Sequence, residues 1–145
     1  MSLGYLEEAK KVKTVSNEGD DNGFLIELFK SKDNTKTEVY LSATKPGMFK
    51  GYHLHRVRAA RYVCLKGKMK IILYKPGEPG SREEHILEVG KTQRLFIPKD
   101  IATGLLNIGD EEAWLVNYPD PPYDPELKDE QVEYSEEELE KGVVK

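Results

Sequence analysis

Short apolar runs that alternate with polar residues fill the chain from residue 24 to 118 and predict β-strands. The clearest is Lys68–Tyr74, where Met69, Ile71 and Leu73 share one face and the two lysines and Ile72 lie opposite. Strands are also predicted for Phe24–Phe29, Thr37–Ala43, Arg61–Leu65, Ile86–Val89, Arg94–Ile97, Ala102–Ile108 and Ala113–Tyr118. No long helical period interrupts them, so the pattern predicts an all-β barrel or sandwich.

Turn-forming residues separate these strands at regular intervals. The predicted turns and loops are Ser16–Gly23, Ser31–Asn34, Lys66-Gly67, Pro76–Ser81, Pro98–Asp100 and Gly109-Asp110. The first residues lack a clean period. Leu6, Ala9 and Lys10 fit a short helical turn, whereas Val12 and Val15 suit the start of a strand.

The composition changes at residue 119. Three prolines fall within residues 119–122, and residues 124–140 hold nine acidic residues against one lysine. Ser135 with Glu138 forms a capping box, which predicts a short helix ending at Gly142. We expect one domain over residues 1–145, with a barrel at about 20–118 and a solvated acidic tail at 119–145. Deleting Glu133–Lys145 is then expected to change stability little.

Composition narrows the classes of function. A chain of 145 residues with 38% hydrophobic residues can bury one core, and a net charge of −4 argues against general nucleic-acid binding. Cys64 is the single cysteine, which excludes an intrachain disulfide or a cysteine-rich zinc site. The apolar runs are too short to span a bilayer, and no signal-peptide core is present. We therefore expect a cytoplasmic protein without membrane or nucleic-acid partners.

Candidate chemistry is concentrated in Thr44–Gly67. His53 and His55 are two residues apart, which puts both imidazoles on one face of a strand. Four cationic side chains surround them: Lys50, Arg56, Arg58 and Arg61. This grouping suits an anionic substrate and a base that is neutral near pH 7. The alternative is a solvated edge strand with two incidental histidines.

The spacing of this stretch resembles the first motif of the cupins, through Gly47, His53, His55, Ala60 and Gly67. A second stretch resembles the second cupin motif, through Pro98, Asp100, Thr103 and Asn107. The resemblance implies a double-stranded β-helix, the cupin jelly roll. Alanine and threonine replace two of the four usual metal ligands, and two imidazoles alone make a weak site. The resemblance thus implies the branch without metal or other cofactor.

Within that branch, the chain resembles the dTDP-4-dehydrorhamnose 3,5-epimerases. The matching segments are Asn22–Phe29, Val39–His53, Leu95–Leu106 and Tyr123–Pro125. The Lys50–His55 segment, KGYHLH, also resembles the R-G-x-H-x-H segment of the dTDP-hexose 3,4-ketoisomerases. The resemblance implies an isomerase that removes a proton beside the ketone of a dTDP-4-keto-6-deoxyhexose. It also implies a homodimer in which the Phe24–Phe29 strand lends residues to the neighbouring site.

The resemblance assigns provisional roles. His53 takes the place of the base, and His55 either supports it or donates a proton. Lys50 or Arg61 can stabilise an oxyanion, and Arg61 can instead clamp a diphosphate. Further substrate contacts are expected from Asn22, Glu27 and Tyr62, and the candidates for reprotonation are His55, Tyr62, Tyr118 and Tyr123.

The chain departs from the epimerases at several of these positions. The acid tyrosine of the epimerases aligns near Val116, and the aspartate that orients their base has no clear counterpart. Asn22 and Lys50 stand where the epimerases have arginines. Two other functions remain open: a sugar- or nucleotide-binding cupin without turnover, and a metal-dependent cupin such as a dioxygenase or small sugar isomerase. Ala60 and Thr103 disfavour the second.

Overall fold

The computed structural model describes residues 2–15, 18–28, 38–121, 124 and 126–145, and almost all of its regular structure is β-strand. The elements are β1 (Tyr5–Glu8), β2 (Lys10–Val15), β3 (Asp21–Glu27), β4 (Tyr40–Thr44), β5 (Phe49–His55), β6 (Ala60–Lys66), β7 (Lys68–Lys75), β8 (Glu78–Glu88), β9 (Gln93–Ile97), β10 (Ala102–Asn107), β11 (Ala113–Asn117), β12 (Gln131–Glu133) and α1 (Glu136–Glu140).

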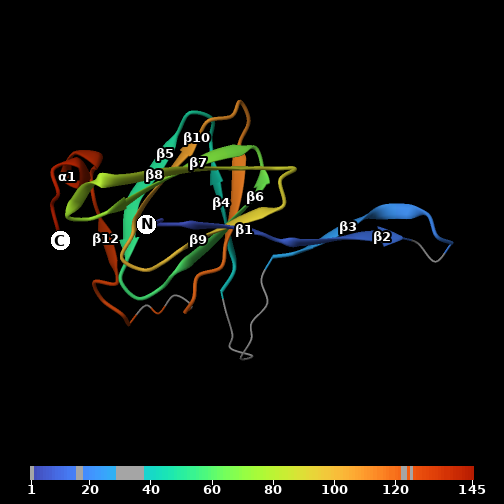
Figure 1. Ribbon diagram of the computed structural model, residues 1–145, viewed down its shortest axis with the longest axis horizontal. Helices are drawn as coiled ribbons and strands as arrows, with labels where there is room; N and C mark the ends of the chain where they lie inside the picture. Colours follow the sequence, from blue (N-terminus) through green and yellow to red (C-terminus); the bar gives the residue numbers. More distant parts are fainter. Residues whose placement is uncertain (1, 16–17, 29–37, 122–123, 125) are drawn as a thin grey trace.

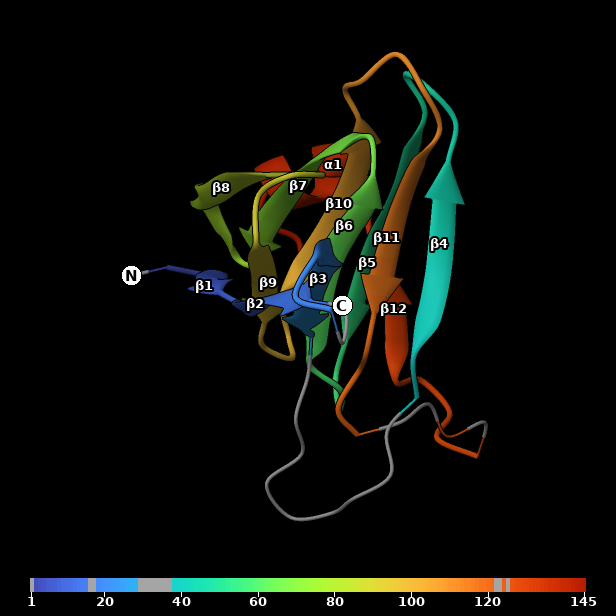
Figure 2. The same cartoon turned by 90° about the vertical axis from the view of Figure 1, so that its right-hand side faces the viewer.

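Two five-stranded antiparallel sheets face each other. One has the order β1-β9-β6-β11-β4, and the other has the order β12-β5-β10-β7-β8 (Figures 1 and 2). Sequence neighbours such as β5 and β6 lie in different sheets, which is the crossing pattern of a jelly roll. The expected all-β cupin architecture is confirmed.

The main core fills the space between the sheets. Met69, Ile71 and Leu73 of β7 are each 0% exposed, as their alternation predicted. They pack against inward-facing residues of the other sheet, including Leu95 and Leu115. Because both sheets contribute every second residue to this layer, the hydrophobic pattern fixes which face of each strand points inward.

The C-terminal segment is not a solvated tail, and that expectation was wrong. β12 pairs with β5, and α1 covers the outer face of the same sheet beside β8 (Figure 1). Tyr134 and Leu139 are 5% and 1% exposed in a second cluster with Tyr52 and Tyr74. The acidic residues between these apolar positions remain largely at the surface, so net charge concealed an amphipathic segment. The Ser135 half of the predicted capping box is confirmed, since Ser135 Oγ accepts a hydrogen bond from Glu138 N at 3.1 Å.

Several predicted boundaries shift. The predicted loop Pro76–Ser81 is mostly strand, because β8 begins at Glu78 and pairs with β7 from there. β8 is an edge strand, where a proline is tolerated since its missing N–H can face solvent. The predicted turn Ser16–Gly23 is shorter, with β3 starting at Asp21. Near the N-terminus the strand alternative holds, as β1 and β2. The predicted turn Ser31–Asn34 lies outside the described residues.

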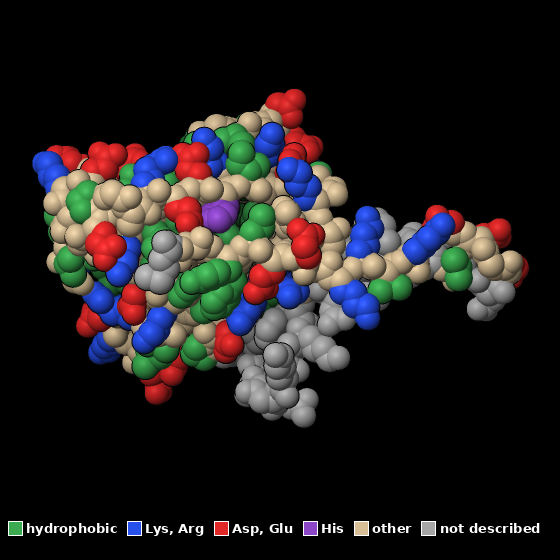
Figure 3. Space-filling view, viewed as in Figure 1, with side chains coloured by type: hydrophobic (Ala, Val, Ile, Leu, Met, Phe, Trp, Pro, Cys, Tyr) green, Lys and Arg blue, Asp and Glu red, His purple; other side chains and the backbone are tan. Residues whose placement is uncertain are grey.

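A two-stranded hairpin of β2 and β3 extends away from the barrel (Figure 1). Lysine side chains and two exposed valines, Val12 and Val15, lie along it (Figure 3). At the outer edge of the first sheet, β4 exposes Leu41, and Val39 just before the strand is exposed as well. In the part of the chain that the structure describes, no helix is long and apolar enough to cross a membrane.

Candidate active site

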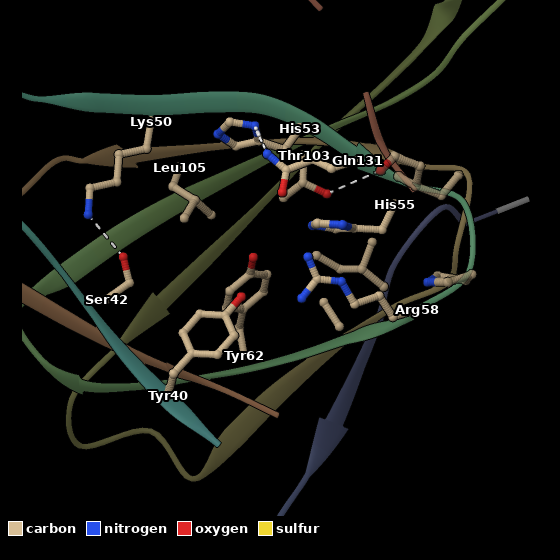
Figure 4. A pocket seen from close by; sticks show the side chains of 14 residues that line it. Tyr40, Ser42, Lys50, His53, His55, Arg58, Tyr62, Thr103, Leu105 and Gln131 are labelled. Carbon is tan, nitrogen blue, oxygen red and sulfur yellow. Dashed lines mark hydrogen bonds between the residues drawn. The ribbon is translucent and has the colours of Figure 1, made fainter. Parts of the chain in front are cut away.

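A cavity of about 200 Å³ opens between the two sheets at one end of the barrel (Figure 4). Its polar lining consists of Tyr40, Ser42, Lys50, His53, His55, Arg58, Tyr62, Thr103 and Gln131. Apolar residues that include Ile97, Ile101 and Leu105 complete the wall. The four key positions of the two cupin motifs, His53, His55, Ala60 and Thr103, all line this one cavity. The motif spacing therefore brings its key positions to a single site.

Strand alternation on β5 directs both histidines into the cavity. Tyr52 and Leu54, which alternate with the histidines, are 2% and 3% exposed on the opposite face, in the cluster under α1. Burial of these two side chains fixes the register of β5, since a one-residue slip would place them in the cavity and the imidazoles under α1. The α1 segment thus holds the histidines in place from behind the sheet.

His55 belongs to a buried ionic cluster. Its Nδ1 lies 3.3 Å from Glu130 Oε2, and Arg58 Nε donates to both oxygens of that carboxylate at 3.2 Å. Arg58 and Glu130 have side chains 9% and 7% exposed. Burial alone would raise the pKa of Glu130, but the hydrogen bond from His55 and the charges of His55 and Arg58 hold it below its ordinary value. Burial, followed by the charge of Arg58, lowers the pKa of His55, so its imidazole is neutral at pH 7.

His53 has a different environment. Its side chain is 41% exposed, against 21% for His55. Its Nδ1 lies 3.2 Å from Gln131 Nε2 and 3.5 Å from Glu133 Oε1 (Figure 4). On the neighbouring strand β10, Thr103 is its cross-strand partner, where the second cupin motif usually has a histidine. The two imidazoles are therefore held by different residues of the same C-terminal segment.

Two tyrosine hydroxyls face the histidines across the cavity (Figure 4). Tyr40 lies on β4 and Tyr62 on β6. The Tyr40 hydroxyl accepts a hydrogen bond from Asn117 Nδ2 at 2.7 Å, and Asn117 Oδ1 accepts one from the backbone N–H of Arg61. Since this bond occupies the hydroxyl oxygen as acceptor, the Tyr40 proton can be donated toward the cavity. Burial raises the pKa of Tyr62, which keeps its phenol protonated.

Lys50 lies at the mouth of the cavity, with its ammonium donating to Ser42 Oγ at 3.0 Å and to the carbonyl of Ala43 at 2.6 Å. The predicted residues His53, His55, Lys50 and Tyr62 are thus brought together. Among the described residues, no group of three histidine, cysteine or acidic side chains is arranged to hold a metal ion.

Other predicted residues lie elsewhere. Tyr118 is buried on the outer face of the first sheet, where its hydroxyl donates to the carbonyl of Leu28 at 2.6 Å and burial raises its pKa to about 12. Arg61 alternates with Tyr62 and so points outward, with its guanidinium 4.9 Å from the ring centre of Phe96. Neither side chain is among those described as lining the cavity.

Two further predicted residues belong to a segment that, among the described residues, does not line the cavity. Asn22 and Glu27 lie on β3, in the projecting hairpin. Tyr123 lies outside the described residues.

Sequence reasoning missed Tyr40, Glu130 and Gln131. The last two come from the segment that was expected to be solvated. Its signal was present, because Val132 and Tyr134 alternate with polar residues as in a half-buried strand. The sequence showed no clear counterpart of the carboxylate that orients the base of the epimerases, whereas in the structure Glu130 lies within hydrogen-bonding distance of His55.

Comparison with known proteins agrees with this fold. The model of the polysaccharide biosynthesis C-terminal domain family matches residues 18–131. A probable low-salt glycan biosynthesis epimerase of Haloferax volcanii is 31% identical over 131 residues, which cover 83% of this chain and 83% of the relative. The spore coat polysaccharide biosynthesis protein SpsL of Bacillus subtilis is 25% identical over 127 residues, covering 83% of this chain and 84% of SpsL. The chain belongs to the polysaccharide biosynthesis C-terminal domain family.

Solved structures share the fold at low identity. The sugar 3,4-ketoisomerase QdtA of Thermoanaerobacterium thermosaccharolyticum, in complex with TDP-4-keto-6-deoxyglucose, superposes with a TM-score of 0.72 at 17% identity, covering 98% of this chain and 95% of QdtA. A dTDP-6-deoxy-D-glucose-3,5-epimerase of Legionella pneumophila gives 0.72 at 18% identity, covering 95% and 77%. A dTDP sugar isomerase of Desulfovibrio desulfuricans gives 0.70 at 19% identity, covering 92% and 84%. The resemblance to dTDP-sugar epimerases and ketoisomerases is confirmed at the level of fold.

Proposed function

We propose that this protein is a nucleotide-sugar isomerase of polysaccharide biosynthesis. It acts on a dTDP-4-keto-6-deoxyhexose by moving a proton at the carbon beside the ketone, as an epimerase or a ketoisomerase. The observation that carries the proposal is the pair of histidines on one wall of the cavity with two tyrosine hydroxyls on the opposite wall. The curated relatives and the structural neighbours support the class of reaction and the class of substrate.

The residues suit enolisation. A neutral imidazole is a base of suitable strength near pH 7, and general-base catalysis contributes roughly 10²- to 10⁴-fold. Hydrogen-bond donors that surround a developing enolate oxygen in a partly closed cavity stabilise it more than water does. Tyr40 and Tyr62 supply hydroxyl protons from the far wall, where a carbon can be reprotonated on the face opposite the base. That arrangement allows inversion at a carbon or return of the proton to a neighbouring one.

The negative charge of a nucleotide diphosphate needs cations near the mouth. Lys50 and Arg58 are the cationic side chains described in the cavity lining. Arg58 is engaged by Glu130, so Lys50 is the one we assign to phosphate or to the sugar oxygen. Its present partners, Ser42 and a backbone carbonyl, are neutral and can be exchanged for a phosphate oxygen.

We further propose a homodimer in which the β2–β3 hairpin reaches the neighbouring subunit. An isolated two-stranded ribbon is marginally stable in water, and an exposed edge such as β4 invites pairing. The hairpin carries Asn22 and Glu27, which then contact substrate in the partner's cavity. Light scattering at micromolar concentration should give twice the chain mass of 16.5 kDa. A clean monomer would contradict a dimer in which the hairpin reaches the neighbouring subunit.

Solvent deuterium incorporation tests the reaction. Purified protein is incubated in D₂O with dTDP-4-keto-6-deoxyglucose, and the sugar is analysed by mass spectrometry and proton NMR. We expect deuterium to appear at the carbon beside the ketone. Replacing both histidines with asparagine should abolish this incorporation. Tight binding of the nucleotide sugar without incorporation would instead favour a binding protein that lacks turnover.

A further inference from the structure

The C-terminal strand β12 contacts the two cavity histidines with chemically different side chains. β12 pairs antiparallel with β5, so that Gln131 stands opposite His55 and Glu133 opposite His53. Glu130, just before the strand, brings a carboxylate to His55, and Gln131 brings an amide to His53. Glu130 Oε2 lies 3.3 Å from Nδ1 of His55, and Gln131 Nε2 lies 3.2 Å from Nδ1 of His53.

The contact with Glu130 determines which nitrogen of His55 carries the proton. An ionised carboxylate only accepts hydrogen bonds, so Nδ1 of His55 must donate. Arg58 keeps Glu130 ionised by donating to both of its oxygens. The other nitrogen, Nε2, then keeps its lone pair on the cavity side of the ring (Figure 4).

The contact with Gln131 has the opposite consequence for His53. An amide nitrogen only donates, so Nδ1 of His53 must accept and its proton is on Nε2. Glu133 competes for the same Nδ1, and its carboxylate would favour a proton there. That carboxylate is farther away, at 3.5 Å, and its side chain is 74% exposed, so water screens it. The amide contact therefore decides the tautomer.

We infer that Glu130 and Gln131 are positioning residues that hold the two histidines in complementary tautomers, with His55 as the general base and His53 as a hydrogen-bond donor. This reverses the roles expected from the sequence, where His53 was the base. The chemical meaning of the inference rests on the proposed function, but the tautomers themselves exist without substrate.

The proton transfer follows from these tautomers. The C–H bond beside the ketone breaks, and its proton forms an N–H bond at Nε2 of His55. The electron pair of that bond moves onto the carbonyl oxygen, which accepts a hydrogen bond from Nε2–H of His53. In epimerisation, a tyrosine on the far wall delivers a proton to the opposite face of the same carbon, the ketone re-forms, and His55 returns its proton to that tyrosine. In ketoisomerisation, the proton of the neighbouring hydroxyl passes to the former carbonyl oxygen while His55 or a tyrosine protonates the former carbonyl carbon, so the ketone re-forms at the neighbouring carbon. No external acid, base or oxidant is consumed.

Nitrogen-15 NMR of the free enzyme with labelled histidine measures the tautomers directly, because protonated and unprotonated ring nitrogens have well-separated shifts. We expect His55 protonated at Nδ1 and His53 protonated at Nε2. Gln131→Glu replaces the amide donor with an acceptor of the same length. It should move the His53 proton to Nδ1 and leave His55 unchanged. Glu133→Gln is the matched control on the same strand and should leave both rings as they are.

Activity adds a second readout. In Gln131→Glu the His53 proton is on Nδ1, so Nε2 can no longer donate to the enolate oxygen. Deuterium exchange should then slow by about 10²-fold, the low end for loss of one oxyanion donor, with little change in KM. His55→Asn should lose exchange more completely than His53→Asn. Glu130→Gln tests the other contact and should leave His55 as a mixture of tautomers if the protein folds.

The inference is overturned if His53 of the wild type carries its proton on Nδ1, or if Gln131→Glu leaves both tautomers unchanged. It is also overturned if the wild-type rings exchange rapidly between tautomers. If the tautomers are as inferred but the wild type incorporates no deuterium, the proposed function fails and the positioning role stands.

Discussion

Leu139→Ala should destabilise the whole protein, although Leu139 lies in a five-residue helix near the end of an acidic segment. Its side chain is 1% exposed and packs in the cluster that contains Tyr52, Tyr74 and Tyr134. Leucine-to-alanine changes at buried positions cost about 2–5 kcal/mol, through lost burial and the cavity that remains. A helix this short has no stability of its own, so part of that cost includes detachment of α1.

The size of the effect can be stated for thermal unfolding. Taking about 3 kcal/mol for the substitution and about 3 °C per kcal/mol for a domain of this size, the melting temperature should fall by about 9 °C. Calorimetry or circular dichroism measures this shift. Leu127→Ala is the matched control, because it makes the same chemical change in the same segment at a side chain that is 44% exposed. Surface changes of this kind stay within about 0.5 kcal/mol.

Equal melting temperatures for Leu139→Ala and Leu127→Ala would refute the packing argument and restore the solvated tail. Truncation of the chain tests the same packing on a larger scale. Deleting residues 133–145 exposes Tyr52 and Tyr74, which form the floor under α1. Because Tyr52 fixes the face of β5 that carries the histidines, this deletion should also impair deuterium exchange.

Three other outcomes are expected. Burial lowers the pKa of His55 below its ordinary value of 6.5, so activity that needs the neutral ring should persist below pH 6.5 and fall only at lower pH in a kcat/KM profile. The folding stability linked to this ring is present above pH 6.5 and is lost as the pH falls through the lowered pKa. An acid limb above pH 6.5 would contradict the burial argument. Chelation should leave deuterium exchange unchanged, and loss of exchange together with a bound metal in elemental analysis would contradict this. Tyr40→Phe should slow deuterium exchange by about 10²-fold or more if the Tyr40 hydroxyl delivers the proton. Tyr118→Phe should cost about 1 kcal/mol of stability and retain exchange. Loss of exchange in Tyr118→Phe but not in Tyr40→Phe would identify Tyr118 as the acid.

The strands and the wall that bears the histidines could be predicted from the sequence. The alternation of Met69, Ile71 and Leu73 predicted an inward face because a strand repeats every two residues, and those three side chains are fully buried. The same periodicity put His53 and His55 on one face, and motif spacing predicted that Ala60 and Thr103 would meet them. These features depend on neighbouring residues or on a known motif spacing, so a single sequence is enough to predict them.

The surroundings of the histidines could not be predicted in this way, because they depend on how distant strands are arranged. Glu130 is 75 residues from His55 in the chain, and Tyr40 is 77 residues from the Asn117 that orients it. Contacts of that separation depend on strand order, which periodicity does not specify. Arg61 and Tyr118 illustrate the other side of this limit: both are reasonable chemical candidates, but the pleat turns them to the outer face of their sheet. The net charge of the C-terminal segment wrongly predicted a solvated tail. A strand can pack one face against the protein when only every second residue is apolar, whatever the charge of the residues between.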